Sequence, residues 1–310
     1  MMGTSNPGMS RAARHAGGPT SWRALLREAL AAAQEVVSRL TLTAGQRVVR
    51  GREAGYRPWD PEVIGVDTAT EGAVIGVLRR AGLRAYLLSE EAGAVEIGRA
   101  PGAGSGRGEP VCVVMDPFDG SLLYRRGIRA HWFTAIGIYG RDGEPRAAGA
   151  VDHITGEVIL ADASGAVRAD RPGARPTPLR PAKTTRLDGA AVEAYLMKPG
   201  FLYPTATALR PLFERARLIL PNGGPYGFAD VACGRIDVYF AWNEALTEVF
   251  SSMYIAERAG CVVTGWDGSP VRFRPDIYAV HSLVCSANPR LHQQVLQALR
   301  GITPPRGVRP

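Results

Sequence analysis

Two aspartates at the end of an apolar segment are the residues of this chain best suited to bind a metal ion. Asp116 and Asp119 follow residues 111–115, Val-Cys-Val-Val-Met, whose apolar character predicts a buried strand. Gly120 and Ser121 come next and are expected to open a helix, where free backbone N–H groups and the helix dipole favour an anion. Hard carboxylate oxygens beside an anion pocket predict a site in which Mg2+ bridges to a phosphate.

A second acidic segment also follows an apolar run. Glu90 and Glu91 come after Ser89 and the apolar residues 86–88. Asp and Gly are common in turns, so an isolated Asp-x-x-Asp-Gly is first interpreted as a surface turn. Two acidic clusters, each placed where a strand ends, instead favour one site at the carboxyl ends of strands.

The segment Asp116-Pro117-Phe118-Asp119-Gly120-Ser121 resembles the Asp-Pro-x-Asp-Gly-Ser/Thr signature of the inositol monophosphatase family. That family comprises lithium-sensitive, Mg2+-dependent phosphatases, with fructose-1,6-bisphosphatases and 3'-phosphonucleotide phosphatases as relatives. The likeness spans most of the chain, with its motifs in order. The other matching segments are Asp67 for the Asp of a Thr-Asp pair, Ser89-Glu90-Glu91 for Gly-Glu-Glu, Gly234-Arg235-Ile236-Asp237-Val238-Tyr239 for Gly-x-x-Asp-Ala-Tyr, and Ala259-Gly260-Cys261-Val262-Val263-Thr264 for the end of Glu-Ala-Gly-Gly-x-Val-Thr.

The resemblance implies a cluster of two or three Mg2+ ions held mainly by carboxylates. The first ion would be held by Glu90, Asp116 and the backbone carbonyl of Phe118. Asp116 and Asp119, together with an acid from the C-terminal part of the chain, would hold the second ion. Mg2+ keeps several of its waters, so this small number of protein ligands suffices.

The resemblance also implies which residues handle the attacking water and the phosphate. Ser121 together with Asp67 would orient the water, with Glu90 as a further catalytic residue. The backbone N–H groups of Gly120, Ser121 and Leu122 would cradle the phosphate.

The C-terminal acid departs from the family pattern, which has Trp-Asp before the final helix. Trp242 is followed by an uncharged Asn, whereas a gap-free alignment between Asp237 and Gly260 places Glu248 at the position of the Asp. Glu248 is therefore expected to be the third metal ligand, in preference to Glu244. Alternatively, Glu248 is only an acidic residue in the first turn of a helix, where the helix dipole favours it.

The residues expected to contact the substrate also depart from the family pattern. Leu122-Leu123 replace a polar pair, and the position of the family's substrate-contacting Glu falls on Ala241. Recognition of common inositol phosphates is therefore not expected. The candidate substrate contacts are Asp237, from the Gly-x-x-Asp motif, and Arg125 and Arg126, which either bind a second anionic group or are solvated.

The elements that must position these residues alternate between helices and strands. Four prolines within residues 170–183 predict a crossing between two subdomains, 21–178 and 179–310. Together with the ordered motifs, this predicts a layered α/β sandwich, α-β-α-β-α, with the metal site between the subdomains. Helices are expected over 21–40, 71–81, 228–233, 247–259 and 292–299, strands over 84–88, 133–139, 147–154, 157–161, 236–241 and 261–264, and a glycine-rich surface loop over 100–109.

The composition is that of a globular protein. The 310 residues are 45% hydrophobic, and no run approaches the roughly 18 apolar residues of a membrane span. Residues 1–20 lack an apolar core and are interpreted as a disordered leader and not as a secretory signal. The four cysteines have no zinc-type spacing and are expected to be reduced core thiols. A cytoplasmic location is expected.

The net charge of +8 comes almost entirely from arginine, because Lys183 and Lys198 are the only lysines. The arginines are dispersed and no aromatic-rich motif for stacking bases is present, so nucleic-acid binding is not expected. A basic surface also suits an anionic small substrate.

Taken together, the residues and the resemblance predict Mg2+-dependent hydrolysis of a small phosphate monoester, which would be a sugar, polyol or nucleotide phosphate. The partner is expected to be a small phosphorylated metabolite, and a homodimer is expected. Two alternatives stay open: a catalytically weak homologue that binds a phosphorylated ligand, or an enzyme for a specialised biosynthetic phosphate or diphosphate.

Overall fold

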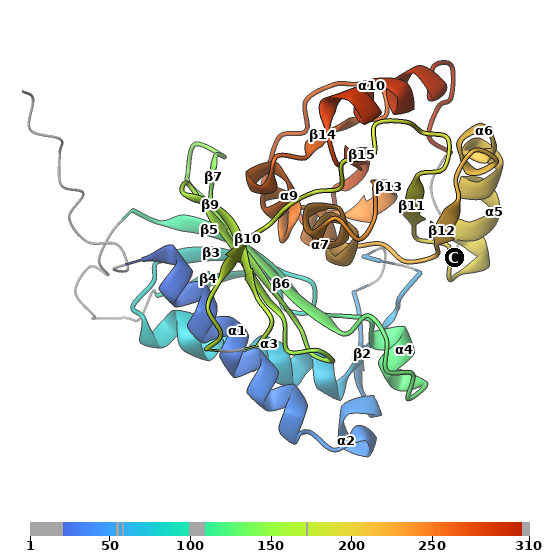
Figure 1. Ribbon diagram of the computed structural model, residues 1–310. Coiled ribbons are helices and arrows are strands. Elements are labelled where there is room, and N and C mark those ends of the chain that lie inside the picture. Colours follow the sequence, from blue (N-terminus) through green and yellow to red (C-terminus); the bar gives the residue numbers. More distant parts are fainter. Residues whose placement is uncertain (1–20, 54–55, 58, 99–108, 172, 306–310) are drawn as a thin grey trace, which may run out of the picture.

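Helices and two β-sheets alternate in five layers, so the predicted layered α/β sandwich is confirmed (Figure 1). The computed structural model describes residues 21–305 apart from 54–55, 58, 99–108 and 172. The expected leader over 1–20 and nearly all of the expected loop over 100–109 therefore lie outside the described residues.

The larger sheet has eight mostly antiparallel strands and is covered on its outer face by α1 (Trp22–Arg39) and α3 (Gly65–Arg80). Apolar residues of α1 recur every three or four positions, which places them on the face that packs against the sheet. In spatial order the strands are β10 (Thr177–Pro178), β9 (Gly165–Ala169), β8 (Val158–Asp162), β7 (Pro145–Asp152), β6 (Phe133–Tyr139), β5 (Val111–Asp119), β3 (Ala85–Ser89) and β4 (Gly93–Ile97).

The smaller sheet has five strands and is built from the later part of the chain. Its outer face is covered by α5 (Pro199–Ala208), α6 (Arg210–Phe213) and α10 (Pro289–Ala298). In spatial order the strands are β12 (Leu218–Leu220), β11 (Ala191–Ala194), β13 (Val238–Ala245), β15 (Val280–Ser286) and β14 (Val262–Gly265).

The middle layer of helices lies between the two sheets and forms the largest apolar core. It consists of α7 (Pro225–Cys233), α8 (Leu246–Phe250) and α9 (Met253–Ala259). Side chains of these helices pack together with Ala135 and Ala148 of the larger sheet and with Tyr239 and Leu283 of the smaller one. Burial of this apolar surface joins the two halves of the molecule.

Short elements surround the end of the larger sheet where β5 leads into α4 (Ser121–Arg125). There α2 (Leu42–Gln46) is followed by β1 (Val48–Gly51), which pairs antiparallel with β2 (Glu62–Ile64). The segment between β1 and β2 reaches toward the smaller sheet, because the side chain of Lys198 contacts the carbonyl of Trp59.

Several helix and strand boundaries differ from the sequence predictions, and two of the differences have a clear physical reason. The helix expected over 71–81 begins at Gly65, since the Asp67 carboxylate accepts the backbone N–H of Ile64 and caps the helix. The helix expected over 247–259 is divided into α8 and α9, and Ser252 at the break hydrogen-bonds the carbonyl of Pro225. The proline-rich crossing contains the two-residue strand β10.

None of the helices in the described part of the chain is long and apolar enough to cross a membrane.

Candidate active site

A β-bulge in β5 brings Asp116 and Asp119 to one face of the larger sheet. Asp116 lies opposite Ala135 on β6 and Asp119 lies opposite Phe133, so three residue steps on β5 match two on β6. In a regular strand, residues three apart point to opposite faces, and the extra residue of a bulge cancels this alternation. Pro117 lies inside the bulge and has no backbone N–H, so it leaves no donor without a partner there.

Glu90 and Glu248 complete the cluster from two other elements. Glu90 follows β3, which pairs parallel with β5, and its backbone N–H donates to the Met115 carbonyl next to Asp116. Glu248 lies in the first turn of α8, where one carboxylate oxygen accepts the N–H of Ala245 at 3.0 Å. Ligand oxygens of Glu90, Asp116 and Glu248 all lie within 4.8 Å of one another.

Burial and the charges of neighbouring carboxylates disfavour the ionised forms of the two aspartates in the cluster. Burial raises the pKa of Asp116 well above its usual range, and the charge of Glu90 raises it further. Burial followed by the charge of Glu248 does the same to the pKa of Asp119. Asp116 Oδ1 and Asp119 Oδ2 are buried without a hydrogen-bond partner among the described residues. Oxygen atoms grouped in this way fit a divalent cation, which supplies the missing positive charge.

Two buried arginines contact the cluster from the segment between β1 and β2. The Arg57 guanidinium lies 2.7 Å from Glu248 Oε1 and 3.3 Å from Glu90 Oε1. Arg52 lies 2.9 Å from the same Glu90 oxygen and 2.6 Å from Glu91. Burial alone would raise the pKa of Glu248, but the charge of Arg57 lowers it to about 2.

A hydrogen-bonded pair, the buried Asp67 and the half-buried Ser121, lies beside the cluster. The Ser121 hydroxyl donates to Asp67 Oδ1 at 2.5 Å and also lies 3.0 Å from the carbonyl of Phe118. The other oxygen of Asp67 caps α3 through the N–H of Ile64. Burial raises the pKa of Asp67 to about 7, although its hydrogen bonds to Ser121 and Ile64 act in the opposite direction.

Gly120 allows the chain to turn sharply from β5 into α4. Its φ of 99° lies in the left-handed region, and a Cβ at this position would come within 2.0 Å of the carbonyl oxygen of His131. Only glycine fits this close approach. The turn then leaves the first backbone N–H groups of α4 without partners inside the helix.

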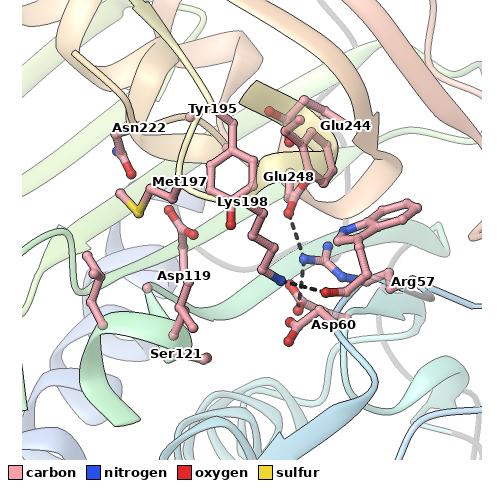
Figure 2. Close-up of a pocket in the computed structure, with 18 of the residues that line it drawn as sticks. Arg57, Asp60, Asp119, Ser121, Tyr195, Met197, Lys198, Asn222, Glu244 and Glu248 are labelled. Atoms are coloured by element: carbon pink, nitrogen blue, oxygen red, sulfur yellow. Dashed lines mark hydrogen bonds and ion pairs between the residues drawn. The ribbon is translucent and has the colours of Figure 1, made fainter. Parts of the chain in front are cut away.

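The cluster forms one wall of a pocket between the two halves of the molecule (Figure 2). The opposite wall comes from the smaller sheet and was not foreseen from the sequence as part of the site. Lys198 extends across the pocket and donates a 2.6 Å hydrogen bond to the Trp59 carbonyl. The unforeseen lining residues include Arg57, Trp59, Asp60, Tyr195, Met197, Lys198, Phe201 and Asn222.

Glu244 lines the same pocket because β13 also contains a bulge. Ala241 lies opposite Leu283 and Glu244 opposite His281, and the intervening Asn243 has a left-handed φ of 56°. Ala241 and Glu244 therefore share a face. Burial, followed by the charge of Glu248, raises the pKa of Glu244 well above its usual range. The sequence analysis ranks Glu244 second to Glu248 as the C-terminal acid, and the structure brings both glutamates to the pocket.

Most of the site residues predicted from the sequence line the pocket, whereas Asp67 and Asp116 lie outside its described lining. Glu90, Phe118, Asp119, Gly120, Ser121, Leu122 and Glu248 line the pocket.

Three candidate substrate contacts lie elsewhere. Arg125 is exposed and ion-paired with Glu62, and Arg126 is exposed. Asp237 accepts the backbone N–H of Ala191 at 2.8 Å, a contact that fixes the start of β11. These three side chains are outside the described lining of the pocket, so we do not include them in the site proposed below.

Residues 21–303 match the model of the inositol monophosphatase family, and the chain belongs to this family. Membership supports phosphatase activity.

Similar proteins agree with this assignment. A fructose-1,6-bisphosphatase/inositol-1-monophosphatase of Methanothermobacter thermautotrophicus is 25% identical over 247 residues, which cover 76% of this chain and 83% of the relative. An inositol monophosphatase structure from Anabaena has a TM-score of 0.68 and 22% identity and covers 91% of this chain and 96% of its own. The extragenic suppressor protein suhB of Bartonella henselae has a TM-score of 0.70 and 20% identity, covering 90% and 98%. The structural likenesses support the fold.

Proposed function

We propose that the protein is a Mg2+-dependent phosphoric monoester hydrolase that acts on a small sugar, polyol or nucleotide phosphate. The observation that carries this proposal is the carboxylate cluster, in which Asp116 Oδ1 and Asp119 Oδ2 are buried without a hydrogen-bond partner among the described residues, next to the hydrogen-bonded pair of Ser121 and Asp67. Glu90, Asp119, Ser121 and Glu248 line one pocket, so a cation and an oriented water would lie side by side there.

Glu90, Asp116, the Phe118 carbonyl, Asp119 and Glu248 would hold the metal ions. When bound, two or three Mg2+ ions would neutralise the phosphate, activate a water molecule and stabilise the leaving oxygen.

The protein's own residues would orient the reactants. Because Ser121 donates its proton to Asp67, a lone pair of Ser121 Oγ is free to accept a hydrogen bond from the attacking water. Asp67, with a pKa near 7, is suited to take up the proton that the water releases. The N–H groups of Gly120, Ser121 and Leu122 would hold the phosphate oxygens.

The pocket offers a substrate both apolar and polar contacts. Leu122 is 39% exposed beside the proposed phosphate site and adds an apolar surface there. Lys198 and Asn222, on the opposite wall, supply polar groups to a bound substrate. The name of the Methanothermobacter relative adds fructose 1,6-bisphosphate and inositol 1-phosphate to the compounds worth testing.

The test is phosphate release from a broad panel of sugar, polyol and nucleotide phosphates and diphosphates, with Mg2+ and with EDTA. We expect Mg2+-dependent release from at least one monoester and its loss in Asp119→Asn. Asp142→Asn, at an exposed carboxylate paired with Arg146, is the matched control. Absence of metal-dependent release from every compound would favour a homologue that only binds a phosphorylated ligand. Release from diphosphates alone would favour the specialised biosynthetic alternative.

A further inference from the structure

The Arg57 side chain contacts two glutamates of the carboxylate cluster. Its Nη2 atom lies 2.7 Å from Glu248 and 3.3 Å from Glu90, and these glutamates are two of the three residues whose oxygens group within 4.8 Å. Figure 2 shows its guanidinium directed at Glu248. Arg57 is only 8% exposed, so water screens this charge poorly. A positive charge of the protein is thus already placed among the oxygens that suit a metal ion.

Arg57 bridges the two halves of the molecule. Glu90 follows a strand of the larger sheet, whereas Glu248 belongs to a helix of the middle layer. Both contacts are made through one nitrogen, and Nε and Nη1 of Arg57 are buried without a partner among the described residues. Its backbone has a left-handed φ of 47°, which is uncommon for arginine. Within the part of the chain that the structure describes, the ion pairs of the guanidinium are therefore those with these two glutamates.

Glu90 also pairs with Arg52, whereas no contact of Arg52 with Glu248 is seen among the described residues. Arg52 contacts Glu90, Glu91 and Asp60, so Glu90 stays paired if Arg57 withdraws. Glu248 has Arg57 as its ion-pair partner among the described residues. Arg57 Nη2 lies 2.7 Å from Glu248, so a divalent cation bound to Glu248 and Asp119 would lie close to the buried positive charge of Arg57. Like charges at short distance in a buried site repel strongly.

We propose that Arg57 is a resident cation that competes with a divalent metal ion for Glu248 and Glu90. Metal binding must displace the guanidinium from Glu248, so the protein binds metal more weakly than its carboxylates alone would allow. This inference rests on the proposed function only in that the cluster binds a divalent cation, and it does not depend on which phosphate is hydrolysed.

The first test measures Mn2+ binding to the full chain by electron paramagnetic resonance of free Mn2+, without substrate or phosphate. Removing the charge in Arg57→Gln should lower the dissociation constant about tenfold or more, because a buried like charge is removed. Arg57→Lys keeps the charge and should bind Mn2+ within about threefold of the unmodified protein. Arg215→Gln, at an exposed arginine paired with Asp188, is the matched control and should bind like the unmodified protein.

Unchanged or weaker Mn2+ binding in a folded Arg57→Gln protein would overturn the proposal, as would absence of Mn2+ binding to both proteins. If the unmodified protein bound Mn2+ but released no phosphate from any compound of the panel, this would count against the proposed function only.

A second measurement uses the unmodified protein and does not require Arg57→Gln to fold. The side-chain Nε–H signal of Arg57 is recorded by NMR on 15N-arginine-labelled protein and assigned by its absence in Arg57→Lys. Saturation with Mg2+ should shift this signal as the guanidinium leaves Glu248, and an unchanged signal in Mg2+-saturated protein would contradict the displacement.

Discussion

The Ser121 hydroxyl donates a 2.5 Å hydrogen bond to Asp67, and this contact joins the turn after β5 to the first turn of α3. Asp67 uses its other oxygen to cap α3, so the carboxylate cannot rotate away without uncapping the helix. The contact therefore fixes both the position of Ser121 Oγ and the direction of its proton. Such fixed geometry is what a water-orienting pair requires.

Ser121→Ala and Asp67→Asn are each expected to lower kcat by about a hundredfold or more, the scale of a lost proton-transfer group. The double variant should be no slower than the slower single variant, because the two residues act as one unit. Steady-state kinetics with the best substrate of the panel measure this. Thr70→Ser, one turn further along α3, is the control and should keep normal turnover. Independent, multiplicative losses would show that the pair does not function as a unit.

Glu248→Gln and Glu244→Gln are expected to have different effects on metal binding. Glu248 is ionised, because Arg57 lowers its pKa to about 2, so an amide removes a charge from the cluster. Burial and the charge of Glu248 raise the pKa of Glu244 and so favour its neutral form, for which an amide is a close substitute. Calorimetric titration with Mg2+ should therefore show about tenfold or greater weakening for Glu248→Gln and little change for Glu244→Gln. The reverse order would make Glu244 the C-terminal ligand.

The part of the site that lies on β5 could be predicted from the sequence because its geometry is local. An apolar run, two aspartates around a proline and a following glycine define the strand and the turn over a few residues, whereas the bulge was found only in the structure. Glu90 was also predictable, since it follows a strand that pairs directly with β5. The five-layered fold followed from the order of these motifs along the chain.

The remaining lining of the pocket could not be predicted because it depends on how distant segments pack. Arg57 and Lys198 lie in segments without a recognisable motif, and Glu244 reaches the pocket through a bulge marked only by the left-handed Asn243. The break between α8 and α9 depends on a hydrogen bond from Ser252 to another helix. The domain boundaries, the homodimer and the cytoplasmic location stay predictions.

Asp119→Asn is expected to stabilise the metal-free protein while abolishing the gain in stability from Mg2+. Asp119 Oδ2 is buried without a partner among the described residues, so the folded state must bury its charge or bind a proton. An uncharged amide removes that cost of about 1–3 kcal/mol, which raises the melting temperature in EDTA by a few degrees. Calorimetry with EDTA and with Mg2+ measures both effects, and Asp142→Asn should show neither. A lower melting temperature in EDTA would contradict the prediction.

The neutral state of His153 makes the stability of the folded protein depend on pH. The ring is buried between Gln34 and Thr134, 2.9 and 2.7 Å from their side-chain oxygens. Burial lowers its pKa to about 3, although the charge of Asp152 opposes this shift. In the unfolded chain the imidazole has its ordinary pKa of about 6.5. Between these values only the unfolded state binds the proton, so this contribution to stability is complete above pH 6.5 and is lost as the pH falls toward 3.

Replacing His153 with Gln removes this titration and keeps a neutral hydrogen-bonding side chain. From pH 7 to pH 5, His153 should account for about 2 kcal/mol of the decrease in the free energy of unfolding. The decrease should therefore be smaller in His153→Gln by that amount, even if the variant is less stable at every pH. Urea unfolding in EDTA at several pH values measures both slopes, and the metal-site carboxylates contribute equally to each protein. Equal slopes would mean that His153 is protonated in the folded protein or does not titrate in this range.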